Sequence, residues 1–202
     1  SFPELLHEAK VFSHLVSDHY HYWEDGGLTY HNRYTTYDFI RGQERDPWKA
    51  MVQPPWERLR EKYHKAQFND TPRSLYYHYI INREFMKEEK DFCSVKCFDG
   101  GIEFLELNRN AENWLLQIET FDPHEPFFAP SRFRKNYPTN YKGPIRDWPP
   151  YSRVTEAPDE CDELRANYSA IIALCDAQLG RLLDYFDENN MWHDTALIVT
   201  TD

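Results

Sequence analysis

The apolar positions of this chain follow two patterns, a helical stripe and a few short continuous runs. The stripe covers residues 162–190, where apolar side chains recur at intervals of three and four residues, and Asn189-Asn190 closes it. Its members are Leu164, Tyr168, Ile171, Ile172, Cys175, Leu179, Leu182, Leu183 and Phe186. This spacing predicts an amphipathic helix that buries one face in the core.

Three continuous apolar runs predict buried strands at Val11–Val16, Trp114–Thr120 and Thr195–Thr201. None of them alternates with polar residues, which is typical of strands covered on both faces. Shorter helical patterns occupy residues 3–10 and about 101–112. Strands separated by helices indicate an α/β layer fold with a largely parallel sheet. We expect the three runs to be neighbours in one sheet, with the long helix packed on one face.

Two segments lack a clear period. Ser17 to about Trp48 is aromatic and rich in His, and we interpret it as a long functional loop. Residues 127–158 are rich in Pro, Tyr and Arg and are expected to form irregular structure over the sheet. Thr71-Pro72 resembles a helix start, with a capping residue before Pro, and predicts a helix that reaches Met86.

Composition narrows the classes of function. A length of 202 residues fits one domain, and the formal net charge of -11 argues against nucleic acid or an anionic membrane as the main partner. No apolar run is long enough to span a membrane. The 4 Cys are scattered, which favours free thiols in a reducing compartment and therefore a cytoplasmic location. The sequence leaves the oligomeric state unknown.

A His between two prolines follows the second predicted strand, in Asp122-Pro-His124-Glu-Pro126. In parallel sheets, ligands bind beyond the carboxyl ends of the strands. The prolines stiffen the backbone, so His124 can present a ring nitrogen to an anionic oxygen or a leaving group. The alternative is a His that ends the strand by bonding a backbone carbonyl.

Further candidates follow the other two predicted strands. His19 and His21 would lie on one side of an extended segment and could bind a metal or an oxyanion, although this spacing also occurs in packed surface histidines. Asp202 follows the last predicted strand directly, where a carboxylate can be a metal ligand or an ordinary turn residue.

The order of these features resembles the sulfatase family of the alkaline phosphatase superfamily. Residues 168–183 followed by 194–202 look like the stretch before the family's metal motif, and residues 120–127 resemble its His-x-Pro substrate loop. Phe39 to Trp48 resembles a segment of a bacterial subgroup. The resemblance implies an alkaline phosphatase-like three-layer α/β/α fold with a largely parallel sheet, incomplete here. Residues 1–202 would then be the central part of a single catalytic domain.

Carried over residue by residue, the resemblance implies a site. Asp202 would bind a divalent cation, usually calcium, and His124 would contact the sulfate group or the leaving oxygen. His21 matches the His of the family's Lys-x-His segment, while His19 stands where that segment has Lys. A neutral imidazole is a weaker anion clamp than Lys, so this position departs from the family pattern. His124 and His21 would thus be catalytic, and His19 and His124 would bind substrate.

The implied reaction is hydrolysis of a sulfate ester, in a small molecule or a sulfated glycan, by a formylglycine nucleophile. The Cys or Ser that becomes formylglycine, with further metal ligands, is expected outside these 202 residues, so the chain by itself is expected to be inactive. Two alternatives stay open: a phosphodiesterase or phosphonate monoester hydrolase of the same superfamily, and a non-catalytic binding domain on the same fold. We expect His21, His124 and Asp202 to border one cleft.

Overall fold

The protein folds around a small parallel sheet. The computed structural model describes residues 1–68 and 76–201. Within them, β1 (Phe12–Ser17), β2 (Thr36–Phe39) and β3 (Trp114–Glu119) form a three-stranded sheet in the order β2-β1-β3. The sequence prediction that the first two apolar runs are neighbouring strands is therefore confirmed.

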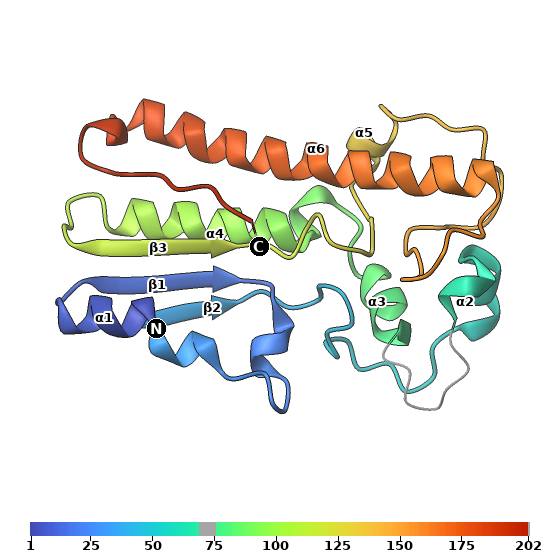
Figure 1. Ribbon diagram of the computed structural model, residues 1–202, viewed down its shortest axis with the longest axis horizontal. Helices are drawn as coiled ribbons and strands as arrows, with labels where there is room; N and C mark the ends of the chain where they lie inside the picture. Colours follow the sequence, from blue (N-terminus) through green and yellow to red (C-terminus); the bar gives the residue numbers. More distant parts are fainter. Residues whose placement is uncertain (69–75, 202) are drawn as a thin grey trace.

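All three strands run in the same direction and end together (Figure 1). β1 pairs with β3 along its whole length, from Phe12 opposite Trp114 to Ser17 opposite Glu119. On its other side, Ser17 is also opposite Phe39 of β2. The loops that follow these strands consequently leave from one edge of the sheet, which we call the carboxyl edge.

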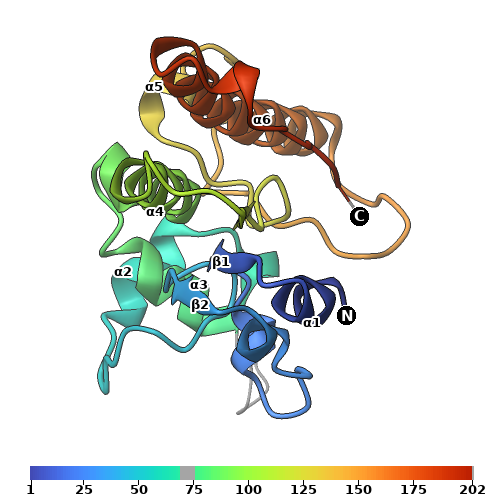
Figure 2. The same cartoon turned by 90° about the vertical axis from the view of Figure 1, so that its left-hand side faces the viewer.

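Helices cover both faces of the sheet and extend beyond its carboxyl edge. α4 (Cys93–Leu107) packs on one face, α1 (Phe2–Glu8) lies on the other, and α6 (Pro158–Glu188) packs outside α4 (Figure 2). This layering agrees with an alkaline phosphatase-like α/β fold. The other helices are α2 (Trp56–Lys62) and α3 (Tyr76–Arg83), beyond the carboxyl edge, and α5 (Ser131–Arg134), beside α6.

Two adjacent glycines allow α4 to lie directly on the sheet. A Cβ atom at Gly101 would collide with the side chain of Ile118 on β3. At Gly100 it would be only 3.1 Å from Cγ1 of Val16 on β1. Glycine weakens a helix, and here that cost is offset by close packing against both strands.

The buried face of α6 differs in part from the predicted stripe. Ile171 is fully buried as expected, and so are Ala170 and Leu174, but Tyr168 and Ile172 are each 42% exposed. The helix turns its smaller residues toward α4 and α5, because these allow the helices to approach closely. Spacing alone identified the helix but did not fix the centre of its buried face.

The last apolar run, Thr195–Thr201, is not a strand, and that prediction was wrong. The segment is irregular, with Ile198 83% and Val199 67% exposed, while Leu197 packs beside α4 and α6. A strand requires a partner for its backbone hydrogen bonds. Over the described ranges the run pairs with no strand, and β3 stays at the edge of the sheet.

Two other elements differ from the sequence prediction in place or extent. β2 lies inside the segment interpreted as a loop, and its side chains are mostly exposed, so no apolar run marked it. The helix expected at about 101–112 is α4, which begins already at Cys93. The predicted helix start at Thr71-Pro72 lies outside the described residues, and Met86 follows the end of α3. Within the described parts of the chain, no helix is both long and apolar enough to cross a membrane.

Candidate active site

Asp18 fastens the loops that follow β1 and β3 at the carboxyl edge. Its Oδ1 accepts a hydrogen bond from the backbone N–H of Phe121 at 2.7 Å. The side chain is fully buried, and Oδ2 has no hydrogen-bond partner among the described residues. Burial, and then the nearby charge of Asp122, raise the pKa of Asp18 well above its ordinary value.

Three histidines surround the ring of Phe121. Its centroid lies 5.0 Å from that of His19, 5.9 Å from His21 and 4.3 Å from His124. The rings of His19 and His21 are 5.2 Å apart and nearly perpendicular. The structure thus brings all three predicted histidines together at one edge of the sheet, although His124 is remote in sequence from the other two. The roles assigned to them stay predictions.

His21 lies between two carboxylates. Its Nδ1 is 2.6 Å from Oε2 of Glu24, and its Nε2 is 2.9 Å from Oε2 of Glu44. The segment is a 3-10 turn (Tyr20–Trp23), not the extended backbone assumed in the sequence analysis. His19 and His21 therefore meet because the chain turns, and not because alternate residues of a strand share a side.

His19 is held by the end of β3. Its Nδ1 is 2.9 Å from Oε1 of Glu119, and its ring stacks on Tyr22 at 4.7 Å. The Tyr22 hydroxyl donates to both oxygens of Glu119, at 2.9 and 3.2 Å. Burial and the charge of Glu119 raise the pKa of Tyr22, so this phenol stays protonated and remains a donor.

His124 makes the backbone contact that the sequence analysis gave as its structural alternative. Its Nδ1 is 2.8 Å from the carbonyl oxygen of Glu125, which fixes the proton of a neutral ring on Nδ1. Its Nε2 lies 3.3 Å from the hydroxyl of Tyr151. A hydrogen bond to the Glu125 carboxylate, with burial, raises the pKa of Tyr151 to about 12. The side chain of His124 is 38% exposed, so an anchored ring still reaches solvent.

The loop after β2 is held by several hydrogen bonds. Asp46 accepts hydrogen bonds from the Arg41 guanidinium at 2.8 and 2.9 Å and from the backbone N–H of Gly42 at 2.7 Å. Asn82 of α3 donates to the carbonyl oxygen of Asp46 at 2.8 Å. Gly42, at φ 116°, supplies the positive backbone angle that this tight turn requires. We call residues 41–46 the clamped loop.

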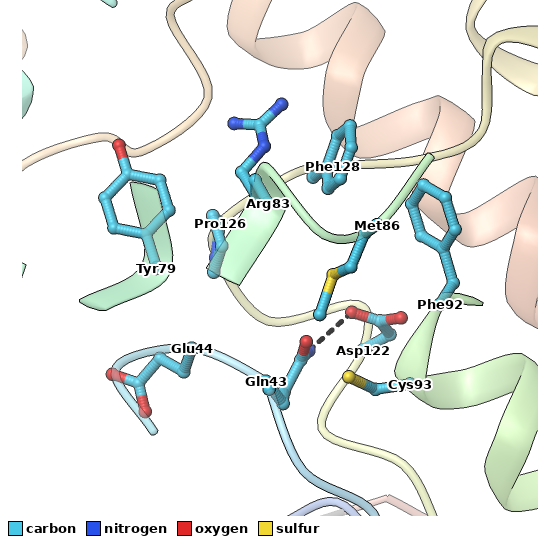
Figure 3. A pocket seen from close by; sticks show the side chains of 11 residues that line it. Gln43, Glu44, Tyr79, Arg83, Met86, Phe92, Cys93, Asp122, Pro126 and Phe128 are labelled. Carbon is cyan, nitrogen blue, oxygen red and sulfur yellow. Dashed lines mark hydrogen bonds between the residues drawn. The ribbon is translucent and has the colours of Figure 1, made fainter. Parts of the chain in front are cut away.

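The clamped loop contacts both other loops of the carboxyl edge. Gln43 donates to Oδ1 of Asp122 at 2.7 Å, and Glu44 accepts from His21. Asp122 is buried and also accepts from the Ser94 hydroxyl. Burial raises the pKa of Asp122 to about 6, against the opposing effect of these two hydrogen bonds. Figure 3 shows Gln43, Glu44 and Asp122 lining a pocket that continues toward α3.

The metal ligand predicted from the sequence, Asp202, lies outside the described residues. In the part of the chain that the structure describes, no three His, Cys, Asp or Glu side chains are arranged to hold a metal ion. Sequence reasoning also missed the carboxylates that hold the histidines, Glu24, Glu44 and Glu119. The only signal for Glu44 was its place in a segment that resembles a bacterial subgroup.

A parallel sheet between helices, with His and carboxylate side chains gathered at its carboxyl edge, defines an α/β protein whose site lies beyond the strand ends. The Sulfatase family model matches residues 1–202, and the chain belongs to this family. Similar to it is the "Multifunctional alkaline phosphatase superfamily protein PehA" of Trinickia caryophylli, 25% identical over 122 residues, 46% of this chain. The chain spans 24% of that relative's length.

Proposed function

We propose that the protein containing this chain hydrolyses sulfate esters, with His124 and His21 as catalytic residues and His19 and His124 as substrate-binding residues. The observation that supports this is the gathering of three imidazoles around Phe121 at the carboxyl edge of a Sulfatase family member. A sulfate ester is an anion with three terminal oxygens. Imidazole rings gathered from two loops suit its recognition.

The three rings differ in which nitrogen atoms their hydrogen bonds leave free to contact a substrate. In His124, the bond from Nδ1 to a carbonyl oxygen keeps one proton on Nδ1, so the proton that a leaving oxygen requires would be a second one, on Nε2 of the imidazolium form. In His19, Nδ1 is used by Glu119, so Nε2 is the atom that would meet a sulfate oxygen. His21 has both nitrogens on carboxylates, so it would act by its position beside Phe121 and not through a free N–H group.

The cofactors belong to the proposal for the whole protein. The family resemblance implies a divalent cation, calcium, with Asp202 as one ligand, and a formylglycine formed from Cys or Ser. The described residues provide no ligand set for the metal, so we assign it no step here. We also propose that the 202-residue chain is inactive by itself. All four cysteines are unbridged, which supports the proposal of a reducing, cytoplasmic compartment.

A second candidate is hydrolysis of phosphate diesters or phosphonate monoesters by the same groups. It is favoured by the printed name of the relative, which describes a multifunctional protein of the alkaline phosphatase superfamily. Sulfate esters and these phosphorus esters are both monoanions of tetrahedral shape, so the three imidazoles suit either.

A comparison of activity on different esters separates the two candidate functions. The full-length protein would be assayed with para-nitrophenyl sulfate, bis-para-nitrophenyl phosphate and a para-nitrophenyl phosphonate, and then with a sulfated glycan. We expect the highest kcat/KM with a sulfate ester. A preference for either phosphorus ester by about tenfold or more, which is about 1.4 kcal/mol of transition-state stabilisation, would establish the second candidate. Turnover of none of them would favour a non-catalytic binding domain.

A further inference from the structure

The two carboxylates that contact His21 determine its protonation. A carboxylate oxygen can only accept a hydrogen bond, so each ring nitrogen that faces one must carry a proton. Oxygens of Glu24 and Glu44 lie 2.6 and 2.9 Å from Nδ1 and Nε2 of His21. If both carboxylates are ionised, both ring nitrogens of His21 carry protons.

Glu44 is the better fixed of the two partners. Its side chain is 6% exposed, whereas that of Glu24 is 38% exposed and belongs to the same turn as His21. Its backbone has φ 47°, a left-handed conformation that is unfavourable for a residue with a side chain. The clamped loop, anchored through Asp46 and Asn82, holds it there. A buried, immobile carboxylate interacts more strongly with a cation than an exposed one, which solvent screens.

The other groups near Glu44 are compatible with a negative charge at this position. Nε of Arg45 lies 3.4 Å from Oε1 of Glu44. Burial, and then the charge of Glu44, raise the pKa of Tyr20, so this phenol is neutral and can donate. Glu44 also lines the pocket that Asp122 borders. Its carboxylate therefore joins the turn after β1 to the pocket at the carboxyl edge.

We propose that Glu44 is a positioning residue that holds His21 as an imidazolium cation against Phe121. The ring is then held in one orientation beside Phe121, where a substrate that carries a tetrahedral oxyanion would enter. This assignment rests on the proposed function, because it assumes that an anionic ester enters between the histidines. The assignment adds to the proposed function a residue that acts only through His21 and makes no contact with substrate.

Nitrogen NMR tests the protonation directly in the full-length protein labelled with ¹⁵N-histidine. At pH 7 we expect both ring nitrogens of His21 to show the chemical shifts of protonated imidazole. In Glu44→Gln the amide can donate to Nε2, so we expect that nitrogen to lose its proton while Nδ1 keeps its bond to Glu24. A neutral His21 ring in the unmodified protein, or an unchanged ring in Glu44→Gln, would overturn the proposal.

A kinetic cycle tests whether Glu44 acts through His21. We expect Glu44→Gln to lower kcat/KM for the preferred anionic ester by about 10- to 100-fold, as for other residues that orient an active-site ring. Glu24→Gln should cost less, and Glu8→Gln, at an exposed position of α1, should have no effect. In a His21→Ala background, Glu44→Gln should change the rate by less than about twofold.

The outcomes separate this inference from the proposed function. If the full-length protein hydrolyses none of the esters, the proposed function fails, while the NMR experiment still decides whether Glu44 keeps His21 protonated. If the protein is active but Glu44→Gln costs the same factor with and without His21, Glu44 does not act through this ring. Failure of the Glu44 variant to fold would leave the decision to the NMR spectrum of the unmodified protein.

Discussion

Oδ1 of Asp18 lies 2.7 Å from the backbone nitrogen of Phe121, a residue 103 positions further along the chain. This bond fixes the segment after β1 to the segment after β3, directly beside the ring that three histidines surround.

His124→Ala should lower turnover of the preferred ester by about 10²–10⁴-fold, because it removes a positioned proton donor. His124 is partly exposed, so the melting temperature should change little. Steady-state kinetics of the full-length protein and a thermal melt measure the two effects. His7→Ala, an exposed position on α1, is the matched control. Full activity in His124→Ala would remove this residue from the mechanism.

The neighbours Ile171 and Ile172 offer a matched test of the α6 interface. Ile171 is fully buried and Ile172 is 42% exposed. We expect Ile171→Ala to lower the free energy of unfolding by about 2–5 kcal/mol, through lost burial and a cavity, and Ile172→Ala by about 1 kcal/mol or less. Denaturant titration of both variants gives the values. Equal losses would show that α6 packs in a different rotation.

Asp122 should make the stability depend on pH. Burial raises its pKa from an ordinary 3.8 to about 6, so between these values the folded state binds more protons than the unfolded state. The free energy of unfolding should therefore fall as pH rises from about 4 to about 6 and then level off, by about 3 kcal/mol at most. Asp122→Asn should remove this slope.

Thermal melts across that pH range test the expectation, with Asp25→Asn, at an exposed position, as the control. Asn keeps one oxygen to accept from Gln43 and carries no charge. A slope that persists unchanged in Asp122→Asn would mean that another buried group, such as Asp18, is responsible.

Calcium should bind the 202-residue chain weakly. The ion takes six to eight oxygen ligands, and a single carboxylate such as that of Asp202 supplies two at most. The described residues add no cluster of three suitable side chains. We expect calorimetry to give a dissociation constant weaker than about 10⁻⁴ M. A micromolar value would show that the metal centre differs from the one inferred by family resemblance.

The apolar runs predicted two strands correctly. They failed for two segments in which apolar sequence and strand pairing do not coincide. Phe12–Ser17 and Trp114–Glu119 are apolar runs that pair with one another. Thr195–Thr201 is equally apolar, yet it pairs with no described strand and stays irregular, because backbone pairing is a property of two segments. Thr36–Phe39 is the reverse case: it pairs with β1, but its exposed side chains carry no apolar signal.

The histidines of the site were predictable from the sequence, but their carboxylate partners were not. His19, His21 and His124 were found because each follows a predicted strand closely, and parallel strands end at one edge. The partners of these rings depend on the path of the loops instead. The position of Glu44 requires a left-handed backbone angle within a loop held by Asp46, which no spacing in the sequence reveals.

The pairing of β1 with β3 has a kinetic consequence. Because these strands are about a hundred residues apart, the intervening chain must close into a long loop before any bond between them forms, and contacts of this separation form slowly. The histidines around Phe121 come from both sides of that closure. After unfolding and refolding, the arrangement of histidines around Phe121 should therefore return with the same rate constant as the parallel sheet. The earlier collapse of the chain should not restore it.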